Sequence, residues 1–115
     1  MIVRKLPWPP KELQPNARVH WAVKAKATKK YKADCLKSLL PHGQIKSRDY
    51  FNITMYPPDN RRRDWDNMVA SIKAAIDAIS IAVGIDDSKL HYDVFTGDAI
   101  PNGELTVYFP DRVAA

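Results

Sequence analysis

The stretch DWDNMVASIKAAIDAISIAVG, residues 64–84, carries the strongest helix signal in the chain. Its apolar side chains recur at intervals of three and four positions, which is the spacing of one face of an α-helix. Gly84 follows the last apolar position and is typical of a helix end. We therefore expect one continuous helix whose apolar face is formed by Trp65, Met68, Val69, Ile72, Ile76, Ile79 and Val83.

Shorter patterns on both sides of this helix predict the rest of the fold. Helix-forming residues from 21 to 40 predict another helix, and the proline-rich segment 7–15 predicts an extended loop. The tripeptide PNG at 101–103 predicts a turn that joins the last two strands. β-branched and aromatic residues predict strands at residues 2–6, 50–56, 91–97 and 104–109.

The resulting order β-α-β-α-β-β is typical of a small α/β (α+β) domain, with two main helices packed against one mixed sheet of about four strands. The length of 115 residues suits a single domain, residues 1–115. Apolar residues make up 45% of the chain, which provides only a modest core. Association with a second copy would therefore add stability.

The sequence favours a soluble cytoplasmic protein with no membrane partner. A single cysteine, Cys35, excludes an intramolecular disulfide. No apolar run approaches the length of a membrane span, and the N-terminal MIVRKLPWPP lacks the apolar core of a signal peptide.

Charge is distributed unevenly along the chain, whose formal net charge is +5. Residues 1–63 contain 15 Lys and Arg against 4 Asp and Glu, whereas residues 64–115 contain 3 against 9. A basic half attracts a polyanion, because neutralised phosphates release their counterions. An acidic half is unfavourable beside DNA unless cations cover its carboxylates or they point away.

The two halves meet inside DNRRRDWDNM, residues 59–68, where three arginines directly precede Asp64 and Asp66. Guanidinium groups bind phosphate, and carboxylates bind a metal ion. In the structural alternative, both aspartates lie in the first turn of the helix, where they cap backbone N–H groups and match the helix dipole. The arginines would then be solvated neighbours.

A further acidic pair, Asp86 and Asp87, follows the helix. Oxygens converging from the helix start and from this later loop would suit Mg²⁺, which polarises a scissile phosphate and activates water. The pair would otherwise belong to an ordinary Asp-rich turn. No cluster predicts zinc, because the histidines are scattered, at His20, His42 and His91.

Four quoted segments together resemble the RusA family of Holliday-junction resolvases: LPWPP (6–10), RRRDWDN (61–67), IKAAIDAI (72–79) and IDDSKL (85–90). The D-x-D-N after an arginine run, followed about 20 residues later by paired aspartates, is the more specific part of this resemblance. It implies a small homodimeric endodeoxyribonuclease, typically encoded by bacteria, phages or prophages. Such an enzyme cuts four-way DNA junctions in recombination and repair, needs Mg²⁺ (for which Mn²⁺ substitutes) and uses no small-molecule cofactor.

Carried onto this sequence, the family's catalytic and metal-binding carboxylates fall on Asp64, Asp66 and Asp87. Asp86 would assist or support the turn. The family's functional lysine often lies four residues after the second aspartate, a position that is Ala70 here. On a continuous helix Lys73 shares a face with Asp66, so we expect Lys73 to take the lysine's catalytic role. Its alternative is a surface lysine paired with Asp77.

The predicted DNA-binding residues come from the basic half of the chain. Trp8 and Trp21 are candidates for stacking on bases, or else belong to the core. Contacts to the DNA backbone are expected from Arg61, Arg62, Arg63, Asn16, Arg18, Lys24, Lys26, Lys29 and Lys30.

Three functions are compatible with these patterns. The first is a Mg²⁺-dependent, structure-specific DNA endonuclease. The second is a non-catalytic basic nucleic-acid-binding module of phage or prophage origin, in which the carboxylates only cap helices. The third is a phage regulatory or interaction protein that kept the fold and lost activity. A pure binder gains nothing from carboxylates beside DNA, which favours the first function.

Overall fold

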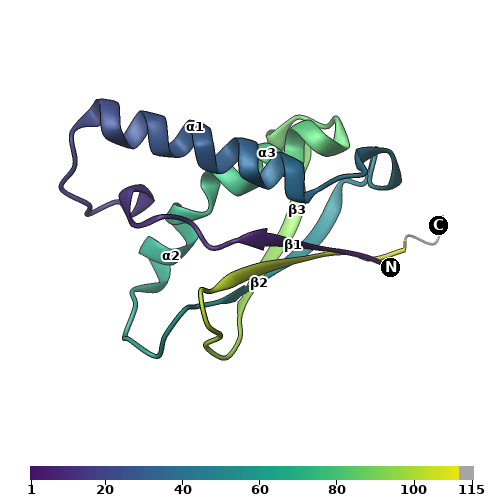
Figure 1. The fold of residues 1–115 in the computed structure, drawn as a ribbon. Coiled ribbons are helices and arrows are strands. Elements are labelled where there is room, and N and C mark those ends of the chain that lie inside the picture. Colours follow the sequence, from purple (N-terminus) through teal and green to yellow (C-terminus); the bar gives the residue numbers. More distant parts are fainter. Residues whose placement is uncertain (112–115) are drawn as a thin grey trace.

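A layer of helices covers one face of a four-stranded sheet in the computed structural model, which describes residues 1–111 (Figure 1). Short 3₁₀ helices at Lys11–Leu13, His42–Gln44 and Asp87–Lys89 lie in the connections. The main elements are β1 (Ile2–Pro7), α1 (Trp21–Ser38), β2 (Tyr50–Tyr56), α2 (Trp65–Ser71), α3 (Lys73–Val83), β3 (His91–Thr96) and β4 (Glu104–Phe109). The fold is thus a small mixed α+β domain, as the sequence predicted.

The sheet has the strand order β1-β4-β2-β3. β4 pairs antiparallel with both β1 and β2, whereas β2 and β3 pair in parallel. The turn before β4 forms where PNG predicts it, with Asn102 and Gly103 both at φ of +67°. This turn nevertheless joins strands that are not neighbours, because β4 enters the middle of the sheet and β3 lies at its edge.

The core lies between the sheet and the helices. Alternate residues of β2 and β4 point to this side, and Ile53 pairs with Val107 across the two strands, both fully buried. The helical layer contributes Cys35 and Leu39 from α1 and its end, together with most of α3. The opposite face of the sheet carries partly exposed polar residues at the alternate positions of β2, such as Asn52 and Thr54. One face of the sheet is therefore packed and the other is open.

The predicted continuous helix from 64 to 84 is wrong at one point, Ile72, where α2 ends and α3 begins. The N–H of Ile72 bonds to the carbonyl of Val69 at 3.3 Å, a tighter turn than an α-helix makes. The hydroxyl of Ser71, which is buried, donates to the carbonyl of Met68 at 2.7 Å. A hydroxyl that bonds back to its own helix often bends it, although Thr28 makes such a bond to the carbonyl of Lys24 without interrupting α1.

The break also changes the expected apolar face. Ile72, Ile76, Ile79 and Val83 are buried as predicted, but Trp65 is 45% exposed at the start of α2. In Figure 1, α2 lies apart from the α1–α3 layer and close to the loop that leaves β2. Among residues 1–111, no helix is long and apolar enough to cross a membrane.

Candidate nucleic-acid interface and metal site

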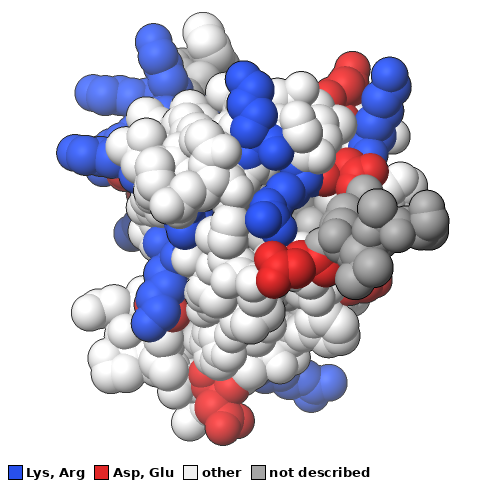
Figure 2. All heavy atoms as spheres, turned by 90° about the vertical axis from the view of Figure 1, so that its right-hand side faces the viewer, with Lys and Arg blue, Asp and Glu red and all other residues white. Residues whose placement is uncertain are grey.

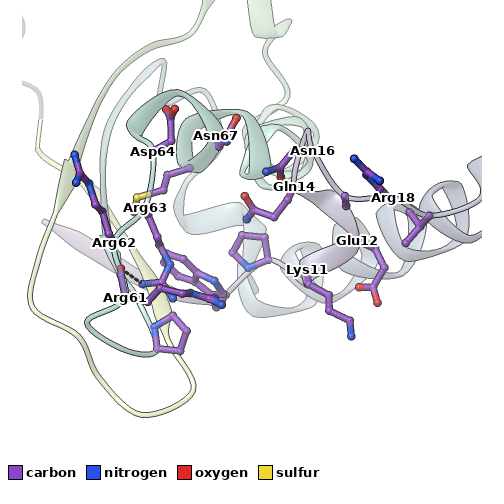
Figure 3. Close-up of a pocket in the computed structure, with 16 residues that line it drawn as sticks. Lys11, Glu12, Gln14, Asn16, Arg18, Arg61, Arg62, Arg63, Asp64 and Asn67 are labelled. Atoms are coloured by element: carbon purple, nitrogen blue, oxygen red, sulfur yellow. Dashed lines mark hydrogen bonds between the residues drawn. The ribbon is translucent and has the colours of Figure 1, made fainter.

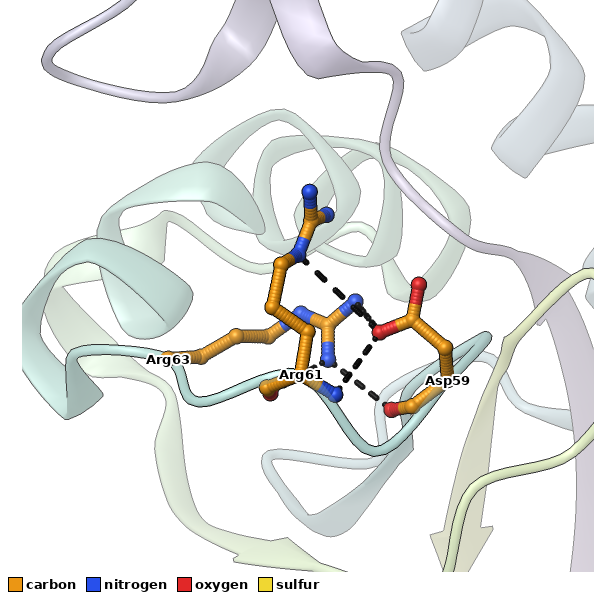
Figure 4. A network of polar contacts seen from close by, with 3 residues as sticks. All are labelled: Asp59, Arg61 and Arg63. Carbon is orange, nitrogen blue, oxygen red and sulfur yellow. Dashed lines mark hydrogen bonds and ion pairs between the residues drawn. The ribbon is translucent and has the colours of Figure 1, made fainter.

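The loop between β2 and α2 is shaped by the carboxylate of Asp59. Its Oδ1 accepts hydrogen bonds from the backbone N–H of Arg61 at 3.0 Å and from the guanidinium of Arg63 at 2.8 Å (Figure 4). The Arg61 N–H, followed by the Arg63 guanidinium, holds the pKa of Asp59 below its usual value. The side chain of Arg61 lies 4.0 Å from the same carboxylate and remains 74% exposed. The loop therefore closes on Asp59 without burying Arg61.

Arg63 differs from the other two arginines because its side chain is only 14% exposed. Its Nη1 donates to the carbonyl oxygens of Asp59 at 2.9 Å and Arg61 at 3.0 Å. The centre of its guanidinium lies 5.9 Å from the centre of the Trp8 ring. Arg63 thus holds the loop against Trp8, whereas Arg61 and Arg62 are exposed and available for phosphate.

Trp8 is itself fixed by its surroundings. Gly103 approaches it so closely that a Cβ at Gly103 would lie 2.9 Å from the Trp8 side chain. With Arg63 over its ring, Trp8 is placed as part of the wall of the site. Trp21, by contrast, is 77% exposed at the start of α1 and contacts only the neighbouring His20 ring among the aromatic pairs of residues 1–111. Trp21 is the more exposed of the two predicted stacking residues.

Asp64 is the N-cap of α2, and its Oδ1 accepts the backbone N–H of Asp66 at 2.8 Å. The capping role that the sequence left open is therefore confirmed for Asp64. Capping engages one carboxylate oxygen and leaves the residue exposed, so it does not prevent metal binding through the other oxygen. Asp66 follows in the first turn and is also exposed.

A basic hollow of about 650 Å³ lies between the N-terminal loop and the loop that leads into α2. Figure 3 shows Gln14, Asn16 and Arg18 on one side of it and Arg61, Arg62 and Asp64 on the other. Segments about 45 positions apart in the sequence thus form one site, which joins the predicted cations to one of the predicted carboxylates. Sequence reasoning missed four further polar lining residues, Lys11, Glu12, Gln14 and Asn67.

The lysines predicted for α1 extend the basic surface away from this hollow. Lys26, Lys29 and Lys30 are exposed, and Lys30 pairs with Asp34 at 3.0 Å. Lys24 is partly buried. Figure 2 shows Lys and Arg side chains gathered at the upper left of the molecule, at the height where α1 lies in Figure 1. The helix therefore presents exposed cations along its outer side.

Asp87 lies in a different part of the molecule from Asp64. It follows α3 and, with Asp77, Asp86 and Lys32, lines a separate hollow of about 270 Å³. The carboxylate of Asp86 accepts the backbone N–H of Ser88 at 3.0 Å, and this bond is the main reason why its pKa is lowered. Asp86 therefore supports the turn, one of the two roles expected for it.

Among the residues described here, no three His, Cys, Asp or Glu side chains are grouped to hold one metal ion. Asp64 and Asp66 lie at the start of α2, whereas Asp87 lies beyond the other end of α3, a helix about 16 Å long. One chain therefore does not bring together the three predicted ligands. Asp64 and Asp66 are ligands of the kind that Mg²⁺ takes, because this ion commonly binds one or two carboxylates together with waters and phosphate oxygens.

Lys73 is exposed at the first position of α3. Its expected alignment with Asp66 assumed a continuous helix, and the break at Ile72 removes that geometric argument. The ion pairs formed within residues 1–111 do not include the alternative pair with Asp77. The side chain of Lys73 is thus exposed to solvent.

Comparison with known proteins adds no assigned activity. The chain is similar to a protein of Xylella fastidiosa (strain Temecula1) that is described only as an uncharacterized protein, with 39% identity over 90 residues. The match covers 73% of this chain and 59% of the relative, so the chain spans little more than half of that protein's length. No protein-family profile matches the chain.

Proposed function

We propose that this protein is a RusA-like, Mg²⁺-dependent DNA endonuclease that resolves Holliday junctions in recombination and repair. The observation that carries the proposal is the basic hollow, where exposed arginines from two distant segments line the same site as Asp64. Exposed guanidinium groups bind phosphate and offset the repulsion between a carboxylate and the DNA backbone. A carboxylate in a site lined by arginines suits a phosphodiesterase better than a simple binder.

Each residue group has a separate task in this proposal. Arg61, Arg62 and Arg18 hold the phosphates that flank the cut, while Arg63 keeps their loop in position through Asp59 and Trp8. The lysines of α1 bind the arms of the junction without reading sequence, since phosphate contacts position DNA and do not specify it. Lys73 does not line the hollow, so its proposed role of stabilising charge that develops on the phosphate rests on the resemblance alone.

Asp64 and Asp66 provide the ligands for Mg²⁺. When bound, the ion would polarise the scissile phosphate and favour attack by water. Both carboxylates are exposed to solvent, so an ion can reach them without a rearrangement of the protein. The cap from Asp64 to the Asp66 N–H fixes the orientation of the first carboxylate.

The third predicted ligand, Asp87, would reach the ion from a second copy of the chain. A four-way junction is nearly two-fold symmetric and has two strands to cut, so a two-fold dimer suits it. In such a dimer each copy would contribute Asp87 to its partner's site, which explains how ligands far apart in one chain serve one ion. The alternative is that Asp64 and Asp66 act alone.

One observation favours a second function, that of a non-catalytic nucleic-acid-binding module. Asp64 already has a complete structural explanation as the N-cap of α2. The variant Asp64→Asn separates the two functions, because asparagine caps a helix as well as aspartate does but carries no charge. We expect Asp64→Asn to bind a synthetic four-way junction at least as tightly as the wild type and to leave it uncut in Mg²⁺.

The matched control is Asp64→Ala, which removes the cap as well as the charge. It should lose cleavage and also some stability, whereas Asp64→Asn should keep its melting temperature. If Asp64→Asn cuts the junction as fast as the wild type, Asp64 is only a cap. If the wild type binds the junction but cuts no DNA with Mg²⁺ or Mn²⁺, the binding module is correct.

A further inference from the structure

The basic hollow is more than a positively charged surface. Its volume of about 650 Å³ lies within the range of pockets that enclose small organic ligands, about 300–1,000 Å³. Part of its wall is apolar and is built from Trp8, Pro9, Ala17, Val19, Pro58 and Met68. A site that only held duplex phosphates would need neither this depth nor this wall, because phosphates lie on the outside of the duplex.

We propose that the basic hollow receives one unstacked nucleotide of the branched DNA, with its base against the apolar wall and its phosphate on the surrounding arginines. This inference rests on the proposed function and specifies which part of the junction the site holds. It would make the branch point, and not the duplex arms, the feature that the protein recognises.

The charges and hydrogen-bonding groups of the hollow match the two parts of a nucleotide. Five cations, Lys11, Arg18, Arg61, Arg62 and Arg63, outnumber the two acidic residues, Glu12 and Asp64. The amides of Gln14, Asn16 and Asn67 each offer donors and an acceptor, which are the groups that pair with the edge of a base. The lining therefore combines phosphate binding with polar and apolar contacts for a base.

The hollow is also held open in the structure. Trp8 is fixed by the close approach of Gly103 and by the guanidinium of Arg63. Arg63 is in turn bound to Asp59 at 2.8 Å, which secures the loop on the other side. Little ordering would be needed on binding, and preorganisation of this kind favours affinity.

An unstacked nucleotide requires the least free energy at a branch point of the DNA. A base inside a duplex has both faces covered, so entering the hollow would require breaking its stacking. Base pairs at a four-way junction flank a discontinuity and are more easily opened. The hollow would therefore remain empty on a duplex and be filled at a junction.

The test uses a synthetic four-way junction with 2-aminopurine at the branch point, bound in EDTA so that no strand is cut. Fluorescence of this base rises when it leaves the stack. We expect a severalfold rise with the wild-type protein and no rise on a continuous duplex of the same sequence. Ala17→Trp should fill the hollow, abolish the rise and weaken junction binding, because the hollow is then closed to the nucleotide.

The matched control is Ala33→Trp, an exposed position of α1 that does not line the hollow, and it should behave as the wild type does. Val19→Trp repeats the test at a lining residue that is 38% exposed, in case Ala17→Trp fails to fold by circular dichroism. No rise with bound wild-type protein, or an undiminished rise with a folded filling variant, would overturn the inference. A junction that is cut in Mg²⁺ without any rise would refute the nucleotide site alone, whereas a junction neither preferred nor cut would refute the proposed function.

Discussion

The three consecutive arginines should respond differently to mutation, and Arg63 provides the sharpest case. Arg63→Ala removes two hydrogen bonds to backbone carbonyls, at 2.9 and 3.0 Å, the bond to the Asp59 carboxylate at 2.8 Å, and the contact with the Trp8 ring. Each such hydrogen bond contributes about 1 kcal/mol, and a cation–π contact at a partly exposed site about 0.5–1 kcal/mol. Because water replaces some of these contacts, we expect the free energy of unfolding to fall by about 2 kcal/mol.

For a chain of this length, 1 kcal/mol corresponds to about 4 °C, so the melting temperature of Arg63→Ala should fall by about 8 °C. Arg62→Ala is the matched control, because Arg62 is exposed. It should leave the melting temperature nearly unchanged, weaken junction binding and lower the slope of log affinity against log salt by about one. Thermal unfolding and salt-dependent binding of both variants test this. An unchanged melting temperature for Arg63→Ala, together with a loss of binding equal to that of Arg62→Ala, would show that Arg63 binds DNA directly.

Three further predictions concern catalysis and assembly. Asp66→Asn and Asp87→Asn should each bind the junction at least as tightly as the wild type and fail to cut it, because each removes a negative charge near phosphate; parallel loss of binding and cutting would instead indicate a folding defect. If Asp87 acts on the partner's site, mixing the inactive Asp66→Asn and Asp87→Asn proteins should restore cutting at one site of each mixed dimer. If subunits exchange and no cutting returns, the two copies do not share a site. Lys73→Ala should slow cleavage with little change in junction affinity. Adding Ala70→Lys to that variant should restore activity only if both positions face the same phosphate. A wild-type cleavage rate for Lys73→Ala would show that Lys73 is not part of the site.

Local sequence patterns predicted the elements of this fold well, because each element is encoded by neighbouring residues. Residues 50–56 were predicted as a strand and are β2 at the same bounds. The break at Ile72 was not predicted, since the apolar residues on both sides of it keep the helical spacing. The spacing of apolar residues predicts which face of a helix is buried, and it does not predict where the helix is interrupted.

The arrangement of these elements in space was harder to predict from the sequence. The central position of β4 depends on its pairing with β1 and β2 at once, and nothing within residues 104–109 specifies those partners. The role of Arg63 was missed for the same reason, because its ring partner, Trp8, is 55 positions away in the sequence. The separation of Asp87 from Asp64 likewise appears only when α2 and α3 are placed in space.

The central claim is metal-dependent cutting of branched DNA, and one measurement tests it most directly. The wild-type protein is incubated with a labelled four-way junction, and with a linear duplex of the same sequence, in Mg²⁺ and in EDTA. We predict paired nicks at the branch point of the junction in Mg²⁺, no cutting of the duplex, and no cutting in EDTA. Full cleavage after exhaustive chelation, or tight junction binding without any cleavage in Mg²⁺ or Mn²⁺, would contradict the claim.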